Sequence, residues 1–178
     1  METKKFELVS AKSNIEWTGK KVTGAHNGTI DIKAGTLTLT DGKLNGGSFV
    51  IDTTSIKILD ITDPGTNAQF AGHLASEDFF AIDSYPEATF TITGTSPVNG
   101  SNSLVTGDLT IKGITHPLSF VADISTSADT ITASGKIIVD RTKYEMKFRS
   151  GNFFTNLGDT LIYNEFELDV QLTASATL

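Results

Sequence analysis

The stretch DPGTNAQFAGHLASEDFF, residues 63–80, lies between two long regions that are rich in Thr, Ser and Gly. Thr66 and Gln69 have the spacing of a capping box, which predicts that a helix begins at Thr66. Phe70 and Leu74 are four residues apart, so they would share one apolar face of that helix. No other part of the chain has this period. We therefore expect one short helix, placed as a lid on an otherwise all-β fold.

Outside this stretch, apolar and polar residues alternate, which is typical of half-buried strands. The last segment shows the pattern most clearly, because Phe166 and Leu168 alternate with Glu165 and Glu167. A parallel sheet would require crossover helices, and strands of about ten residues favour a barrel over a sandwich. The sequence predicts an all-β fold, a single antiparallel β-barrel of about eight strands with one short helical lid segment.

Local signals refine this prediction. His26-Asn27-Gly28 and Asp41-Gly42 have the composition of tight turns, and residues 96–100 have that of a loop. The pair Gly46-Gly47 predicts a bulge within a strand. Small residues at inward positions would leave room inside the barrel: Gly19, Ala88, Gly94, Gly107, Ala122, Ala133 and Gly135.

Composition excludes several classes of function. The 178 residues carry a net charge of −7, so nucleic acid is not an expected partner, and the basic residues at 141–149 are too few to reverse this. The absence of cysteine excludes disulfides and thiol chemistry. No window resembles a signal peptide or a transmembrane segment. We expect a soluble protein, cytoplasmic as the sequence stands and periplasmic if an export signal has been removed.

Polar candidates for chemistry are few. His26, His73 and His116 lack metal-ligand spacing, and the aspartates at 60, 63 and 78 do not follow a calcium loop, so we expect no metal and no cofactor. His73 is expected at the barrel mouth. Arg141 is expected to pair with a surface carboxylate, with contact to an anionic headgroup as the alternative. No catalytic motif is present, and we expect no catalytic residue.

Three segments resemble the YceI-like, polyisoprenoid-binding family in the same order along the chain: residues 72–90, residues 105–117 and the sequence DRTKY at 140–144. The resemblance implies a lipocalin-like barrel that holds a long isoprenoid or fatty acyl molecule in its lumen. Glu145 departs from the family pattern, which commonly has Gly after the aromatic residue.

The resemblance and the alternation together give an expected function. Residues 1–178 would form a single YceI-like lipid-binding barrel domain for non-catalytic binding, storage or transport of a long-chain lipid. A homodimer is left open. The alternatives are an enzyme that uses His73 or His116 as a base, and a closed β module with no ligand. The expected ligand-binding residues are Trp17, Phe49, Ile51, Phe70, Leu74, Phe79, Phe90, Ile92, Leu109, Ile111, Phe120, Ile137, Asn164, Phe166 and Leu168.

Overall fold

The computed structural model describes residues 3–21, 24–41, 43–76, 79–146 and 162–176. Parts of the predictions above, including Gly42, Asp78, Lys147 and Arg149, lie outside the described residues. In chain order, the elements are β1 (Thr3–Leu8), η1 (Ser10–Lys12), β2 (Asn14–Lys21), β3 (Gly24–Thr40), β4 (Lys43–Ile58), α1 (Pro64–Ala75), β5 (Glu87–Asn99), β6 (Asn102–Ile111), β7 (Ile114–Thr126), β8 (Thr130–Asp140), η2 (Arg141–Tyr144) and β9 (Ile162–Ala176).

The sheet closes on itself as an antiparallel barrel. The strand order β3-β2-β9-β8-β7-β6-β5-β4 returns to β3, because β4 also pairs with β3. β1 and β2 both pair with β3 and β9, but with different parts of those strands. Together, with η1 between them, they occupy a single strand position of the barrel. The barrel therefore has eight positions, which confirms the predicted fold class.

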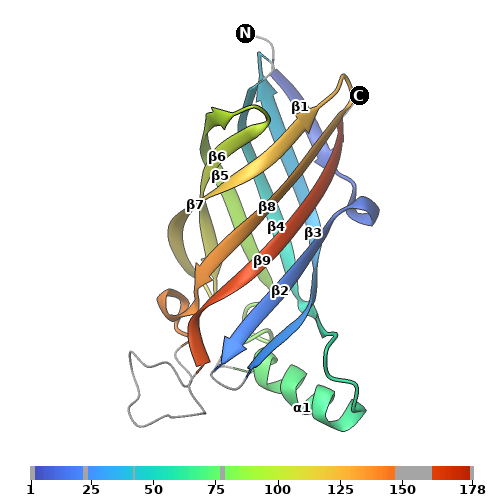
Figure 1. Cartoon of the computed structure of the whole chain (residues 1–178), viewed down its shortest axis with the longest axis vertical. Helices are drawn as coiled ribbons and strands as arrows, with labels where there is room; N and C mark the ends of the chain where they lie inside the picture. Colours follow the sequence, from blue (N-terminus) through green and yellow to red (C-terminus); the bar gives the residue numbers. More distant parts are fainter. Residues whose placement is uncertain (1–2, 22–23, 42, 77–78, 147–161, 177–178) are drawn as a thin grey trace.

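The two ends of the barrel are built differently (Figure 1). α1 lies across the end where β2 finishes and β9 begins, while β1 lies at the opposite end. Near β1 the interior is filled, because Phe6 and Ile131 are 0% and 1% exposed. Leu37 and Ala174 pack in the same layer. Within the described residues, no helix is long and apolar enough to cross a bilayer.

β7 and β8 are hydrogen-bonded over only part of their length. Residues 122–126 of β7 pair with residues 131–135 of β8, and the strands then diverge toward the α1 end of the barrel. Val121 and Ile138 flank this divergence and are exposed. The short helix η2 follows β8, and the Tyr144 ring packs edge-on against His116 of β7 at 5.4 Å. η2 therefore joins the two strands where their backbones separate.

The N-cap of α1 lies three residues earlier than the capping-box pattern predicts. Asp63 is the N-cap, and its Oδ2 accepts hydrogen bonds from the Thr66 N–H at 2.8 Å and from the Thr66 hydroxyl at 2.7 Å. Pro64 follows at the first helical position, where its missing N–H costs nothing. An aspartate cap with proline behind it therefore replaces the predicted Thr66 cap. The predicted apolar face is confirmed, with Leu74 buried and Phe70 half-buried.

One predicted turn and most of the predicted loop at residues 96–100 are strand instead. His26-Asn27-Gly28 lies inside β3 and pairs with β2. β5 continues through residues 96–99, where Pro97 pairs with β6 only. A proline is tolerated there because this part of β5 has no ladder with β4 to interrupt. The predicted bulge lies beside the Gly46-Gly47 pair, because Gly46 pairs with Thr38 and Leu44 with Leu39, which leaves Asn45 as the extra residue.

Several glycines provide space for aromatic rings rather than for a lumen. A Cβ on Gly28 would lie 2.6 Å from Trp17 Cζ2, and one on Gly35 would lie 2.4 Å from Phe49 Cδ1. A Cβ on Gly107 would lie 2.5 Å from Phe90 Cζ. Such distances are shorter than atomic contact permits, so these positions require glycine. The prediction that Gly107 leaves empty volume is therefore wrong, because the Phe90 ring occupies it.

The register of β9 follows the predicted alternation. Glu165 is exposed, as predicted, but it also lines the internal cavity described below. Glu167 meets Lys20 and Lys136 on the outer surface at 3.5 Å and 3.7 Å. Phe166 and Leu168 point inward, where both line the internal cavity described below.

Candidate functional site: an apolar cavity in two parts

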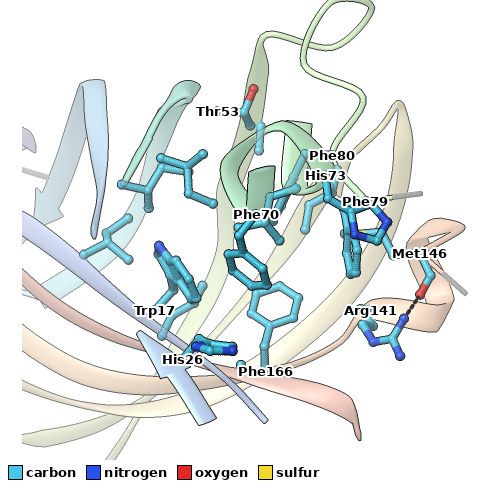
Figure 2. A pocket seen from close by; sticks show the side chains of 18 of the residues that line it. Trp17, His26, Thr53, Phe70, His73, Phe79, Phe80, Arg141, Met146 and Phe166 are labelled. Atoms are coloured by element: carbon cyan, nitrogen blue, oxygen red, sulfur yellow. Dashed lines mark hydrogen bonds between the residues drawn. The ribbon is translucent and has the colours of Figure 1, made fainter. Parts of the chain in front are cut away.

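A cavity of about 540 Å³ lies beneath α1, and we call it the mouth cavity. Its wall comes from inward side chains of the barrel, including Ile15, Trp17 and Leu168, and its cover comes from α1 and the residues that follow it. Figure 2 shows Phe70 pointing from α1 toward the rings of Trp17 and Phe166. The volume is in the range of small-molecule binding sites, which is about 300–1,000 Å³.

A second cavity of about 100 Å³ lies farther from α1, and we call it the deep cavity. Its lining is apolar apart from Ser134, with Phe49, Phe90 and Phe120 among the residues that form it. The two cavities share four lining residues: Ile15, Ile51, Leu109 and Leu168. We call these four the waist. The waist residues form a wall common to both cavities, so the two cavities lie next to each other inside the barrel.

Fourteen of the fifteen predicted ligand-binding residues line at least one cavity. The mouth cavity includes Trp17, Ile51, Phe70, Leu74, Phe79, Leu109, Ile111, Phe166 and Leu168. The deep cavity includes Phe49, Ile51, Phe90, Ile92, Leu109, Phe120, Ile137 and Leu168. Asn164, the predicted polar group of the lumen, lines neither of these two cavities. The structure thus brings together the predicted apolar residues and leaves Asn164 apart from them.

Other lining residues were not predicted to bind a ligand. Ile15 and Ile30 had the required alternation, but nothing in the sequence separated them from ordinary core residues. His26, Thr53 and Met146 also line the mouth cavity. Their positions depend on long-range contacts, which periodicity within a single strand cannot indicate.

His26 connects the barrel wall to the segment that precedes α1. Its Nδ1 lies 2.7 Å from Asp60 Oδ2, and the Asn27 N–H donates to Asp60 Oδ1 at 3.1 Å. The His26 ring also packs against Phe70 of α1, with 4.9 Å between centroids. Burial tends to raise the pKa of Asp60, but the hydrogen bonds from His26 and Asn27 outweigh it, so this pKa lies below its ordinary value of 3.8. The contacts hold α1 over the mouth cavity.

Arg141 is buried, which corrects the expectation of a surface ion pair. The side chain is 3% exposed, lines the mouth cavity and donates from Nη1 to the Met146 carbonyl at 2.5 Å (Figure 2). Its guanidinium carbon lies 5.9 Å from the centre of the Phe79 ring. Burial lowers the pKa of Arg141 to about 10, while Asp140 acts to raise it. Arg141 therefore remains a cation at neutral pH beside the cavity.

The three histidines lie in separate environments. His26 contacts Phe70, His73 packs edge-on against Phe79 at 5.0 Å, and His116 contacts Tyr144. His73 lines the mouth cavity, as predicted from its place in the helix, whereas His116 lines neither cavity. Each ring is thus packed against a different aromatic residue.

The fold and the cavity define an antiparallel β-barrel with an apolar interior that is covered at one end by a helix. The model of the YceI-like domain matches residues 6–174, and the chain belongs to this family. Protein YceI of Escherichia coli O17:K52:H18 is 34% identical over 101 residues, which are 56% of this chain and 52% of that protein. A UPF0312 protein of Pseudomonas putida (strain W619) is 44% identical over 50 residues, 28% of this chain and 26% of that protein. The matches span about a quarter to a half of these relatives.

Solved structures share the fold over almost the whole chain. BcnA of Burkholderia cenocepacia has a TM-score of 0.74 at 21% identity, covering 93% of this chain and 98% of that one. A polyisoprenoid-binding domain from Saccharophagus degradans, implicated in plant cell wall breakdown, has a TM-score of 0.69 at 15% identity and covers 97% of this chain and 98% of that one. At these identities the likeness establishes the barrel architecture.

Proposed function

We propose that residues 1–178 form one binding unit that holds a single long apolar molecule, an isoprenoid or a fatty acyl derivative, for storage or transport without catalysis. The observation that carries this proposal is that two apolar cavities lie next to each other inside the barrel and share the four waist residues. A structure of the same fold that is described as a polyisoprenoid-binding domain supports the same class of ligand.

The cavity lining favours an occupied interior. Apolar side chains around an empty space lack dispersion partners on one side, and water cannot supply them. A hydrocarbon chain would restore those contacts. The alternative of a closed β module requires a filled interior, and a mouth cavity of about 540 Å³ argues against it.

Energetics favour reversible carriage. Each buried methylene is worth roughly 0.8 kcal/mol relative to water. A bilayer offers the same chain a similar gain, so exchange between membrane and barrel should be close to neutral. Such a protein is suited to moving or holding a lipid.

Thermal unfolding before and after delipidation tests this function. A ligand present at a hundred times its dissociation constant stabilises the folded state by about 2.7 kcal/mol. We expect delipidation to lower Tm, and addition of a long isoprenoid or a fatty amide to restore it, while a short alcohol has no effect. An unchanged Tm throughout would contradict the proposal.

A further inference from the structure

The barrel wall is not hydrogen-bonded along the whole of β7 and β8. The last ladder pair between these strands is Ala122 with Gly135. From there toward the α1 end, residues 114–121 of β7 form no ladder pair with β8, and β7 bends away from it (Figure 1). We call this unpaired stretch of the wall the seam. The contact of the Tyr144 ring with His116 closes the seam at its α1 end.

The sequence of β7 along the seam suits a strand with one free edge. β6 pairs with this whole stretch, so only the side that faces β8 is without a ladder. Pro117 lies in the stretch, and proline, which has no N–H, is tolerated in a sheet where one side of the strand has no partner. The outward residues of the stretch are exposed and uncharged: Thr115, Pro117, Ser119 and Val121. A hydrocarbon chain that passed them would not take a charge out of water.

The deep cavity lies behind the seam. Its lining includes inward residues from both sides of the seam, namely Leu118 and Phe120 of β7 and Ile137 of β8. These three side chains are half-buried, whereas Val105 and Leu109, which line the same cavity from β6, are 3% and 6% exposed. The lining of the deep cavity is thus more accessible on the seam side than on the β6 side.

The outer rim of the seam carries exposed apolar side chains. Val121 of β7 and Ile138 of β8 are 49% and 57% exposed, and Leu104, the cross-strand neighbour of Val121 on β6, is 37% exposed. These are three of the six large hydrophobic side chains that are exposed among the described residues, so they form a group rather than a scatter. A group of exposed apolar side chains is typical of a ligand-binding or interaction site.

We propose, resting on the function proposed above, that the seam is a lateral portal. The hydrocarbon chain of the lipid enters and leaves the deep cavity between β7 and β8, and contacts Val121 and Ile138 outside and Phe120 inside as it passes. Separation of β7 from β8 along the seam breaks no ladder hydrogen bond, whereas separation of fully paired neighbours would break several. This route also leaves the contact between His26 and Asp60 at the mouth intact.

A reversible cross-link across the seam tests the portal, because the chain has no cysteine of its own. The double variant Val121→Cys/Ile138→Cys is loaded with a fluorescent long-chain fatty acid or a fluorescent isoprenoid alcohol. It is then joined by the shortest of a series of bismaleimides with a cleavable disulfide spacer that reacts with both cysteines. Release of the probe into an excess of phosphatidylcholine vesicles is measured by fluorescence, before and after reduction of the spacer.

The matched control is Leu104→Cys/Val121→Cys. It shares one cysteine with the test variant and carries the same linker across the intact ladder between β6 and β7. All three side chains are exposed, so neither double variant removes a packed residue. Comparison of each protein with its own reduced form removes any effect of the substitutions themselves.

We expect the cross-link across the seam to slow release by about tenfold or more, because it prevents the strands from separating, and reduction of the spacer to restore the rate. The amount of probe bound at equilibrium should not change, and the control cross-link should not alter the rate. Equal rates in the cross-linked and reduced forms of the test variant overturn the inference and leave the proposed function intact. Equal slowing by both cross-links overturns it as well, since the effect would not belong to the seam. Failure of both probes to bind before cross-linking overturns the proposed function, and this inference with it.

Discussion

The two ends of the barrel have the same alternating sequence pattern and different interiors. At the β1 end, Phe6 and Ile131 are fully buried and fill the space between the strands. At the α1 end, Phe166 is only half-buried and faces the mouth cavity. The strands of one barrel thus enclose a packed core at one end and a binding space at the other. Alternation determines which side chains point inward, while the covering elements determine whether those side chains meet.

The largest expected effect is at the packed end. Phe6→Ala removes a ring that is 0% exposed, and we expect the free energy of unfolding to fall by about 3–5 kcal/mol. Denaturant unfolding measures this loss. Ligand content per folded molecule should stay unchanged, since Phe6 lines neither cavity. A loss of less than about 1 kcal/mol would show that this end is not close-packed.

At the mouth, replacing a phenylalanine by alanine should have a different effect from Phe6→Ala. Phe166→Ala enlarges an existing cavity, so we expect a smaller stability loss of about 1–2 kcal/mol together with weaker ligand retention. Unfolding of the delipidated protein and ligand content after dialysis measure the two effects. A stability loss as large as that of Phe6→Ala, with the ligand retained, would mean that the mouth is packed as closely as the β1 end.

The contact between Asp60 and His26, which holds the segment before α1 in place, should contribute less to stability than either phenylalanine ring. Asp60→Asn replaces the carboxylate that contacts His26 Nδ1 and accepts from the Asn27 N–H, and we expect a loss of about 0.5–1 kcal/mol at neutral pH because both side chains are partly exposed. The folded-state pKa of Asp60 is depressed, so its contribution is present above the ordinary pKa of 3.8 and is lost as the pH falls through the lower, folded value.

Urea unfolding of wild type and Asp60→Asn as a function of pH measures this contribution. The stability difference between the two proteins should shrink as the pH falls below the ordinary pKa of Asp60. A difference that grew as the pH fell below 3.8 would contradict the assigned direction of the pKa shift.

The smallest expected effect is a stabilisation of the lid. Gly72 is an exposed position of α1, and a Cβ there would meet no atom within 4 Å. Gly72→Ala should therefore raise the free energy of unfolding by about 0.5 kcal/mol, because alanine loses less backbone entropy in a helix. Hydrogen exchange of α1 amides should slow, while exchange at the β1 end should not. Faster exchange in α1 would show that position 72 needs glycine.

The sequence predicted the architecture and most of the cavity lining because both depend on strand alternation. Fourteen of the fifteen proposed residues line the two cavities for that reason. Gly28 shows where this reasoning failed. In the sequence, Asn27-Gly28 has the composition of a turn, whereas in the barrel the glycine leaves space for the Trp17 ring from the neighbouring strand.

The polar part of the site could not be predicted for a related reason. Arg141 follows a strand, in a segment that usually reaches the surface, and is buried because η2 turns it inward beneath Phe79. Asn164 occupies an inward position in the alternation predicted for β9 but lines neither cavity. Glu145 takes the left-handed conformation at φ 61°, where the family commonly has glycine. These details depend on how separate elements meet at the mouth.

The central claim is that the two adjacent apolar cavities together hold one lipid, and mass spectrometry of an organic extract tests it most directly. The protein is purified without detergent, extracted, and the extracted lipid is quantified per mole of protein, with Phe6→Ala and Phe166→Ala extracted in parallel. We predict close to one equivalent of a long-chain lipid from the wild type and from Phe6→Ala, and much less from Phe166→Ala. Extracts with no stoichiometric lipid from any of the three proteins would contradict the account.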